Sequence, residues 1–214
     1  TLANLAFIAS EGSAAFTAVG TPTSPGTRMI AVSGHVRRPG VYEIVNGSTT
    51  FRDLLYGDDF AQGIRDGNDL KAFVPGGGSA PWFLPDQLDI PFEGREAGQA
   101  GSMLGSGAVM VMDSTTNVPE AALTLVKFYA HESCGKCVPC RVGVNRMLEI
   151  VTDISEGHGR PEQLDLLEEL GETVAEASLC ALGKTAPNPL VSTIRYFRKE
   201  YEAHIDDRRC PAGV

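Results

Sequence analysis

The chain has 214 residues, of which 43% are hydrophobic and 21% charged, and its 27 acidic and 18 basic residues give a net charge of −9. This composition is that of a globular protein and excludes a disordered chain, while the acidic balance argues against binding to nucleic acids or anionic membranes. No run of about 18 apolar residues is present, so no transmembrane helix is expected. The length allows one ordinary domain or two small ones.

The first 27 residues predict a short helix followed by a linker. Apolar residues at positions 2, 5, 6 and 9 have helical spacing, and the stretch from Gly20 to Thr27 is rich in proline, glycine and threonine. The sequence also opens without a methionine. We therefore expect residues 1–27 to be the end of a preceding domain and a linker.

Residues 28–95 predict a small β-grasp domain. Two runs rich in β-forming residues, 28–34 and 41–45, flank a Pro-Gly turn and are expected to form a hairpin. A short helix, capped within residues 48–50, and a further strand at residues 70–74 follow. A strand pair, a crossing helix and an additional strand are the elements of a β-grasp fold.

The second half of the chain predicts a helical domain. Residues 96–116 are expected to connect the two domains and to contain a strand at 108–112 that is apolar throughout and buried on both faces. Four helices with one apolar face each and short connections follow in residues 117–205, which predicts a four-helix bundle. Residues 206–214 form a tail, and the fold class is α+β.

Three of the five cysteines, Cys134, Cys137 and Cys140, lie within seven residues in the loop between the first two predicted helices. This C-x2-C-x2-C run places three thiolates on one tight loop, which is typical of a [4Fe–4S] cluster. A fourth thiolate is then required, and Cys180 offers one from the loop between the third and fourth helices. Because these two loops lie at the same end of an up-down bundle, we expect the four cysteines to bind one cluster.

Two other interpretations of the cysteines stay open. Zinc also binds four thiolates, although its sites usually draw two ligands from each of two knuckles, whereas this chain offers three and one. In that case the chain is a zinc-stapled docking module without redox activity. Alternatively, two cysteines form a redox-active C-x-x-C pair or are simply buried, but a third thiol adds nothing to that chemistry. Clustered cysteines without a secretory signal favour the reducing cytoplasm.

Three cations, Lys136, Arg141 and Lys184, lie within four positions of a predicted ligand. Together with the N-terminus of the second helix, which has Cys140 in its first turn, they should stabilise the more negative state of a cluster and raise its potential. Each cation alone is equally well explained as ordinary solvated surface charge.

The two cysteine motifs together resemble those of one family. The segments are ESCGKCVPCRVG at residues 132–143 and LCALGKTAPNP at residues 179–189. They are similar to the 51 kDa-type, NADH-oxidising flavoprotein subunits of complex I, NAD(P)-linked hydrogenases and formate dehydrogenases. The second segment, whose likeness continues to residue 205, looks closer to the latter two. Residues 32–42 resemble the β-grasp domain of the same subunits, known as SLBB, so the likeness covers nearly the whole chain.

The resemblance implies a [4Fe–4S] cluster on Cys134, Cys137, Cys140 and Cys180 that accepts electrons from FMN. It also implies partner subunits that carry further clusters, including a 24 kDa-type [2Fe–2S] subunit, within an NAD(P)-dependent oxidoreductase complex peripheral to a membrane or free in the cytoplasm. No catalytic residue is expected in this chain.

The resemblance also marks what this chain lacks. The glycine-rich segments that hold FMN and NADH in relatives are absent, so neither cofactor is expected to bind this chain alone. Residues 1–27 are then expected to be the end of the flavin domain. The tail from Cys210 resembles the start of a ferredoxin-like extension, and Cys210 is left outside the site.

Overall fold

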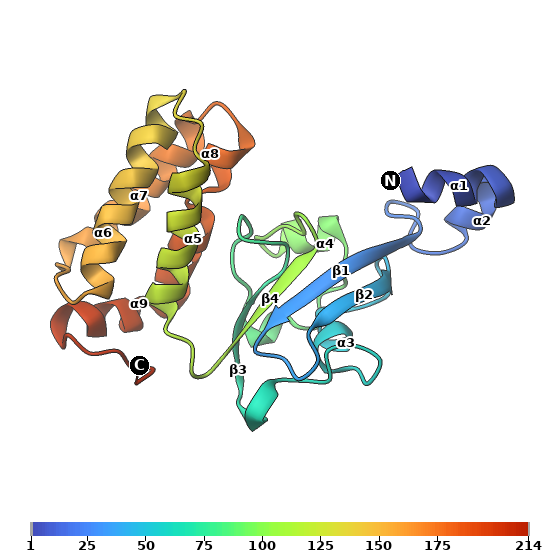
Figure 1. Cartoon of the computed structure of the whole chain (residues 1–214), viewed down its shortest axis with the longest axis horizontal. Coiled ribbons are helices and arrows are strands. Elements are labelled where there is room, and N and C mark those ends of the chain that lie inside the picture. The colour runs from blue at the N-terminus through green and yellow to red at the C-terminus, as the bar shows by residue number, and fades with distance from the viewer. Residues whose placement is uncertain (1, 214) are drawn as a thin grey trace. The chain divides into compact units, whose positions relative to one another are not determined.

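The computed structural model describes residues 2–213 and divides them into two compact units (Figure 1). The first unit runs to Gly77 and includes Phe83–Asp113, whereas the second consists of Gly78–Trp82 and the described chain from Ser114 onward. The α+β fold class is confirmed, because a four-stranded mixed sheet is followed by a helical region. No helix within residues 2–213 is long and apolar enough to cross a membrane.

The first unit contains the sheet and several short helices. In chain order its elements are α1 (Leu2–Glu11), α2 (Ser13–Thr17), β1 (Thr27–Gly34), β2 (Gly40–Val45), α3 (Phe51–Tyr56), η1 (Arg65–Gly67), β3 (Leu70–Val74), η2 (Pro85–Gln87), α4 (Gly94–Gln99) and β4 (Ala108–Asp113).

The sheet has the strand order β2-β1-β4-β3. β1 pairs antiparallel with β2 and parallel with β4, with Ala31 opposite Ala108, and β4 pairs antiparallel with β3. β4 is therefore an inner strand of the sheet, and the expected connecting segment 96–116 belongs largely to this unit. The expected domain end at residue 95 moves to Asp113, because the parallel pairing of β4 with β1 is not visible in any local pattern.

One face of the sheet carries the core of the first unit. Alternating residues of β1 and β4 are buried there, and α3 packs Phe51, Leu54 and Leu55 into the same core. The predicted cap of this helix is confirmed, since the Thr50 hydroxyl accepts a hydrogen bond from the Asp53 N–H. Only part of β4 is buried on both faces, because Ala108 and Met110 on it remain half-exposed.

The second unit is the predicted helical bundle. Its elements are α5 (Val118–Glu132), the π-helical segment η3 (Pro139–Val144), α6 (Asn145–Ser155), α7 (Glu162–Ala177), α8 (Ala181–Thr185) and α9 (Asn188–Asp206). Four long helices, namely α5, η3 with α6, α7 and α9, lie side by side (Figure 1). The short helix α8 is an addition to the four that the sequence predicts.

The helices bury their apolar faces against one another. Met147, Ile150 and Ile154 of α6 are fully buried, as are Leu167 of α7 and Ile194 of α9. Such burial of aliphatic side chains is the main stabilising term of a bundle. The loop before η3 and the loop before α8 lie at the same end of the unit (Figure 1).

Candidate metal centre

The four predicted ligands come from two loops at one end of the helical unit. Cys134 and Cys137 lie between α5 and η3, Cys140 lies in the first turn of η3, and Cys180 is the residue before α8. Cys140 is buried, Cys137 is half-buried, and the other two are exposed. The thiols of the cysteine run therefore range from exposed to buried.

A hydrogen bond connects the two loops. The backbone N–H of Leu179 donates to the thiol of Cys137, and this bond, reinforced by the backbone N–H of Cys140, lowers the pKa of that thiol below its ordinary value. Because the thiolate is the form that binds metals, the fold prepares this sulfur for a ligand role. The contact also places the loop of Cys180 beside the cysteine run, since Leu179 directly precedes Cys180.

A glycine lets the loop of Cys180 approach the run closely. A Cβ at Gly183 would lie 2.6 Å from the Cβ of Ser178 and 3.1 Å from the Cβ of Cys140. Any larger residue would therefore push the loop before α8 away from η3. The Ser178 hydroxyl is buried and forms no hydrogen bond to another oxygen or nitrogen among the described residues. It lies beside the Cys137 thiol and is available to donate a hydrogen bond to that sulfur.

The cysteine run is also shaped by bonds within its own loop. The guanidinium of Arg141 donates to the carbonyl of Gly135 at 2.6 Å, and Gly135 itself has a φ of +72°, which favours glycine. The Ser133 hydroxyl lies 3.2 Å from the sulfur of Cys140 and accepts from the Gly135 N–H at 3.4 Å. These bonds fix the turn of the loop.

The segment η3 differs from the ordinary helix start that Pro139 predicts. Its six residues form a π-helix, a wide turn that is rare and often found at functional sites. The N–H of Cys140 lies in the first turn, where it has no partner within the helix, and is therefore free to donate to the Cys137 thiol.

The donor set fits a cluster in its chemistry, because the loops at one end of the unit carry four thiols together with backbone N–H and hydroxyl donors. Within residues 2–213, no three His, Cys, Asp or Glu side chains group closely enough to hold a single metal ion. The assignment of Cys134, Cys137, Cys140 and Cys180 as ligands therefore rests on donor type, spacing and the loop contacts, and remains a proposal.

Cys210 lies apart from the other cysteines. It lines a cavity of about 620 Å³ together with His158 and His204, next to the loop between α6 and α7. That loop is at the opposite end of the helical unit from the cysteine run (Figure 1). This position agrees with leaving Cys210 outside the site.

Four residues of the site have no role in the predictions from sequence, namely Ser133, Ser178, Leu179 and Gly183. Leu179 acts through its backbone N–H, which every residue except proline carries, so no side-chain pattern reveals it. Gly183 is the one with a sequence signal, because a glycine inside a short helical stretch often marks close packing.

Comparison with known proteins matches most of the helical unit to one family model. The family model of the NADH-ubiquinone oxidoreductase-F iron-sulfur binding region matches residues 120–204. The F subunit of the NADH-quinone oxidoreductase of Streptomyces coelicolor is 42% identical over 210 residues, which are 98% of this chain and 46% of the relative. The HndC subunit of the NADP-reducing hydrogenase of Solidesulfovibrio fructosivorans is 37% identical over 214 residues, which are all of this chain and 43% of the relative.

These matches bear on two expectations. The chain spans less than half the length of the curated relatives it matches. The expected preference for the hydrogenase and formate dehydrogenase branch is not supported, because the quinone oxidoreductase relative has the higher identity of the two, 42% against 37%.

A solved structure matches both units. The crystal structure of an NAD+-reducing [NiFe]-hydrogenase in the H2-reduced state superposes with a TM-score of 0.84 at 31% identity, over 99% of this chain and 35% of that chain. The sheet and the helical bundle are therefore found together in a solved protein.

Proposed function

Because the chain belongs to the family of flavoprotein subunits of NADH-quinone oxidoreductases and related hydrogenases and matches their C-terminal iron–sulfur region, we propose that it relays single electrons. The site is a [4Fe–4S] cluster held by Cys134, Cys137, Cys140 and Cys180. A cluster of this type supplies one-electron storage when bound. The chain's own residues hold the sulfurs and donate hydrogen bonds to them.

The contact between the two cysteine loops is the observation that carries this proposal. The N–H of Leu179 reaches the thiol of Cys137, so the lone cysteine that follows Leu179 is held beside the run of three. Hydrogen bonds to sulfur favour the thiolate and raise the potential of a bound cluster. Two separate zinc knuckles would need two cysteines on each loop, and the second loop has only Cys180.

The rest of the proposal concerns the whole subunit. Oxidation of NAD(P)H through FMN is assigned to sequence outside this chain, since the curated relatives are more than twice as long. Electrons then pass from the flavin through this chain to clusters of partner subunits, among them a 24 kDa-type [2Fe–2S] subunit. The choice of final acceptor lies with those partners.

Metal analysis of the purified chain tests the proposal. The protein is purified without oxygen from iron-supplied cells, and its iron, acid-labile sulfide and zinc are measured. We expect about four iron and four sulfide per chain, with a broad visible absorption that bleaches on reduction by dithionite. Stoichiometric zinc without iron or sulfide would contradict the proposal and leave the zinc-stapled docking module.

A further inference from the structure

A short segment that follows β3 in the sequence belongs to the helical unit. This segment, Gly78–Trp82, is called the strap below. The side chain of Trp82 is buried, and its backbone N–H donates to the hydroxyl of Ser192 on α9 at 3.1 Å. The side-chain amide of Asn188, at the start of α9, donates to the carbonyl of Ser79 at 2.9 Å. The strap is therefore fixed to the helices near both of its ends.

The strap holds the hydroxyl of Tyr129. This residue is buried and lies in the last turn of α5, directly before the cysteine run. Its hydroxyl forms hydrogen bonds with the hydroxyls of Ser79 and Thr185. The Thr185 hydroxyl donates its one proton to the carbonyl of Ala181 at 2.9 Å. It therefore accepts from Tyr129, and Ser79 in turn donates to Tyr129.

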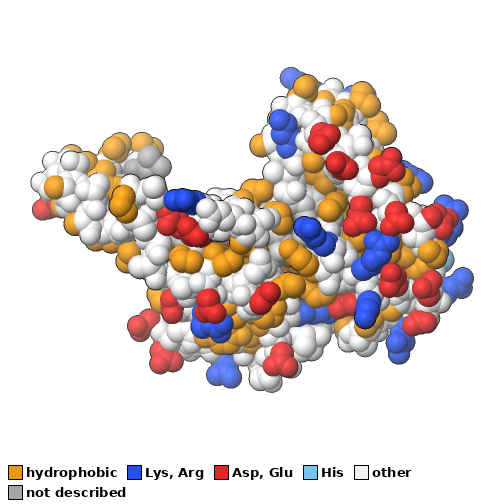
Figure 2. Space-filling model, turned by 180° about the vertical axis from the view of Figure 1, so that it is seen from behind, with side chains coloured by type: hydrophobic (Ala, Val, Ile, Leu, Met, Phe, Trp, Pro, Cys, Tyr) orange, Lys and Arg blue, Asp and Glu red, His pale blue; other side chains and the backbone are white. Residues whose placement is uncertain are grey.

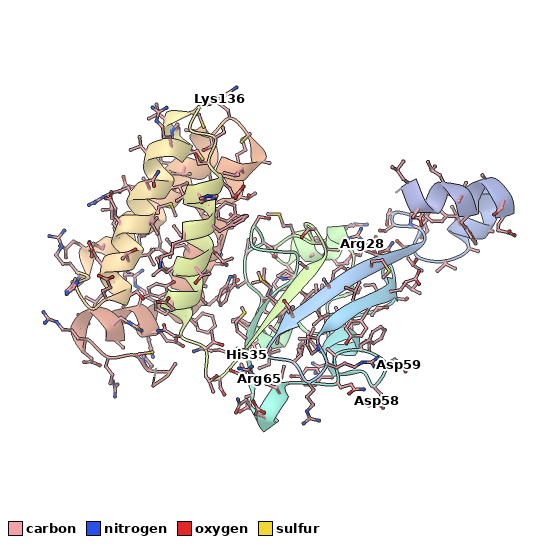
Figure 3. The ribbon with its side chains drawn as sticks, viewed as in Figure 1. Arg28, His35, Asp58, Asp59, Arg65 and Lys136 are labelled. Carbon is pink, nitrogen blue, oxygen red and sulfur yellow. The ribbon has the colours of Figure 1, made fainter. Side chains whose placement is uncertain are left out.

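This chain of hydrogen bonds ends beside a proposed ligand. Ala181 is the first residue of α8 and directly follows Cys180. Because Thr185 is the last residue of the same short helix, a bond to its hydroxyl fixes the helix that begins after this cysteine. Lys136 of the cysteine run marks this end of the helical unit in Figure 3, and α8 lies at the same end in Figure 1.

Tyr129 also contacts the loop of the cysteine run. Its carbonyl accepts a hydrogen bond from the N–H of Ser133 at 3.1 Å, and the Ser133 hydroxyl lies 3.2 Å from the sulfur of Cys140. The side chain of Tyr129 thus binds the helix behind one cysteine loop, while its backbone binds the start of the other.

The network that links the strap to α8 has no charged member. Charged side chains lie on the outside of the helical unit (Figure 2), whereas the network consists of hydroxyls and a carbonyl around the buried Tyr129. Salt screens exposed charges far more than it weakens hydrogen bonds between neutral, buried groups. The effect of the network on the site should therefore be the same at low and at high ionic strength.

We propose that Tyr129 is a positioning residue for the proposed cluster and that the strap holds its hydroxyl in place. The hydroxyl fixes α8, and α8 holds Cys180 and the N–H of Leu179 against the cysteine run. The proposal rests on the proposed function, because it needs Cys180 as a ligand. It goes further, since it assigns the retention of the cluster to a residue and a segment that bind no iron.

The first test compares the cluster-bearing wild type with Tyr129→Phe, which keeps the buried ring and removes only the hydroxyl. Release of iron to excess ferrozine, without oxygen, should be about fivefold faster in the variant, as expected for the loss of one hydrogen bond. Tyr196→Phe, at an exposed tyrosine of α9, is the matched control and should leave the rate unchanged. Equal rates in all three proteins would overturn the proposal, as would an increase that disappears at high salt.

The reduction potential separates positioning from plain stability. Hydrogen bonds to the sulfurs raise the potential of a cluster, so the looser loop of Tyr129→Phe should shift it to more negative values. An unchanged potential would leave Tyr129 with a packing role alone and would overturn the proposal.

Thr185 offers a conservative rescue. Thr185→Ser keeps the hydroxyl and should behave as the wild type, whereas Thr185→Val removes it and should accelerate iron release as Tyr129→Phe does. Because both single variants break the same bond, the double variant should release iron no faster than the faster single variant. Additive effects would show that the two hydroxyls act separately and would overturn the proposal.

Hydrogen exchange of the metal-free chain tests the strap without a cluster. The amides of α8 should exchange faster in Tyr129→Phe and in Ser79→Ala than in the wild type, whereas those of α6, outside the network, should not change. Wild-type exchange of α8 in Ser79→Ala would overturn the role of the strap.

The two proposals fail in different ways. A wild-type chain that binds no iron and sulfide contradicts the proposed function, while the exchange of α8 still tests the contacts of Tyr129. A wild-type chain with a full cluster, whose iron release and potential are the same in Tyr129→Phe, contradicts only the positioning role.

Discussion

The thiol of Cys137 shows how a main-chain group prepares a side chain for metal. Hydrogen bonds from the N–H groups of Leu179 and Cys140 lower the pKa of this thiol, and the two groups come from the two different loops that the site needs. A hydrogen bond to sulfur favours the charged thiolate, which lowers the pKa.

This arrangement predicts the pH dependence of alkylation at Cys137 in the metal-free chain. Only the thiolate reacts with iodoacetamide, so the midpoint of the rate against pH should lie below that of the same cysteine in the chain unfolded by urea. Mass spectrometry of the digested protein gives the rate for this residue. A folded midpoint at or above the unfolded one would contradict the hydrogen bonds described.

The same shift links pH to the stability of the metal-free chain. The pKa of Cys137 is lower in the folded state than in the unfolded state, so folding favours the thiolate. The resulting stabilisation is fully present above the unfolded pKa and is lost as the pH falls through the folded pKa.

Among the elements, α8 decides how closely the two cysteine loops approach. It is a short helix that begins directly after Cys180, and its Gly183 faces Ser178 and Cys140. The packing leaves no room for a methyl group, since the Cβ would stand 2.6 Å from that of Ser178. The close packing of α8 at Gly183 therefore acts as a spacer that sets the distance between the two cysteine loops.

Replacing this glycine tests the spacer role. Gly183→Ala should destabilise the helical unit by about 1–3 kcal/mol through overpacking and should lower the iron content of the purified chain. The matched control is Gly98→Ala in α4, where nothing lies within 4 Å of the added Cβ. Urea denaturation and iron analysis measure both effects. Full iron content in Gly183→Ala would show that the loops do not need this contact.

The elements also show what a single sequence can predict. The strands around residues 28–45, the helix capped by Thr50 and the four long helices follow from local periodicity and caps, and all are confirmed. The place of β4 inside the sheet does not follow, because its pairing with β1 joins segments more than 70 residues apart. The π-helical start of η3 and the helix α8 depend on contacts between loops, which no local pattern records.

At the scale of the whole molecule, one unit carries the proposed chemistry. The proposed ligands and their hydrogen-bond donors all lie in the helical unit, and the sheet unit has a separate core. The sequence alone points to Cys134, Cys137, Cys140 and Cys180 because thiol spacing is a strong signal. It does not reveal the neighbours that orient these thiols, since these act through backbone groups and close packing.

The division into two units predicts which part of the chain stays unchanged when a cluster ligand is replaced. Cys180→Ser should leave hydrogen exchange in β1, β2 and β4 unchanged, because their core residues, such as Ile30, Ile44 and Val109, belong to a cluster made of residues of the first unit. Cys210→Ser is the matched control, since this cysteine lies at the other end of the helical unit.

The most direct measurement of the central claim is electron paramagnetic resonance of the dithionite-reduced chain, compared with Cys180→Ser and Cys210→Ser. We predict a [4Fe–4S] signal of about one spin per chain in the wild type and in Cys210→Ser, and its loss or conversion in Cys180→Ser. An identical signal in Cys180→Ser would show that the second loop supplies no ligand and would contradict the proposal that four cysteines from two loops hold one cluster.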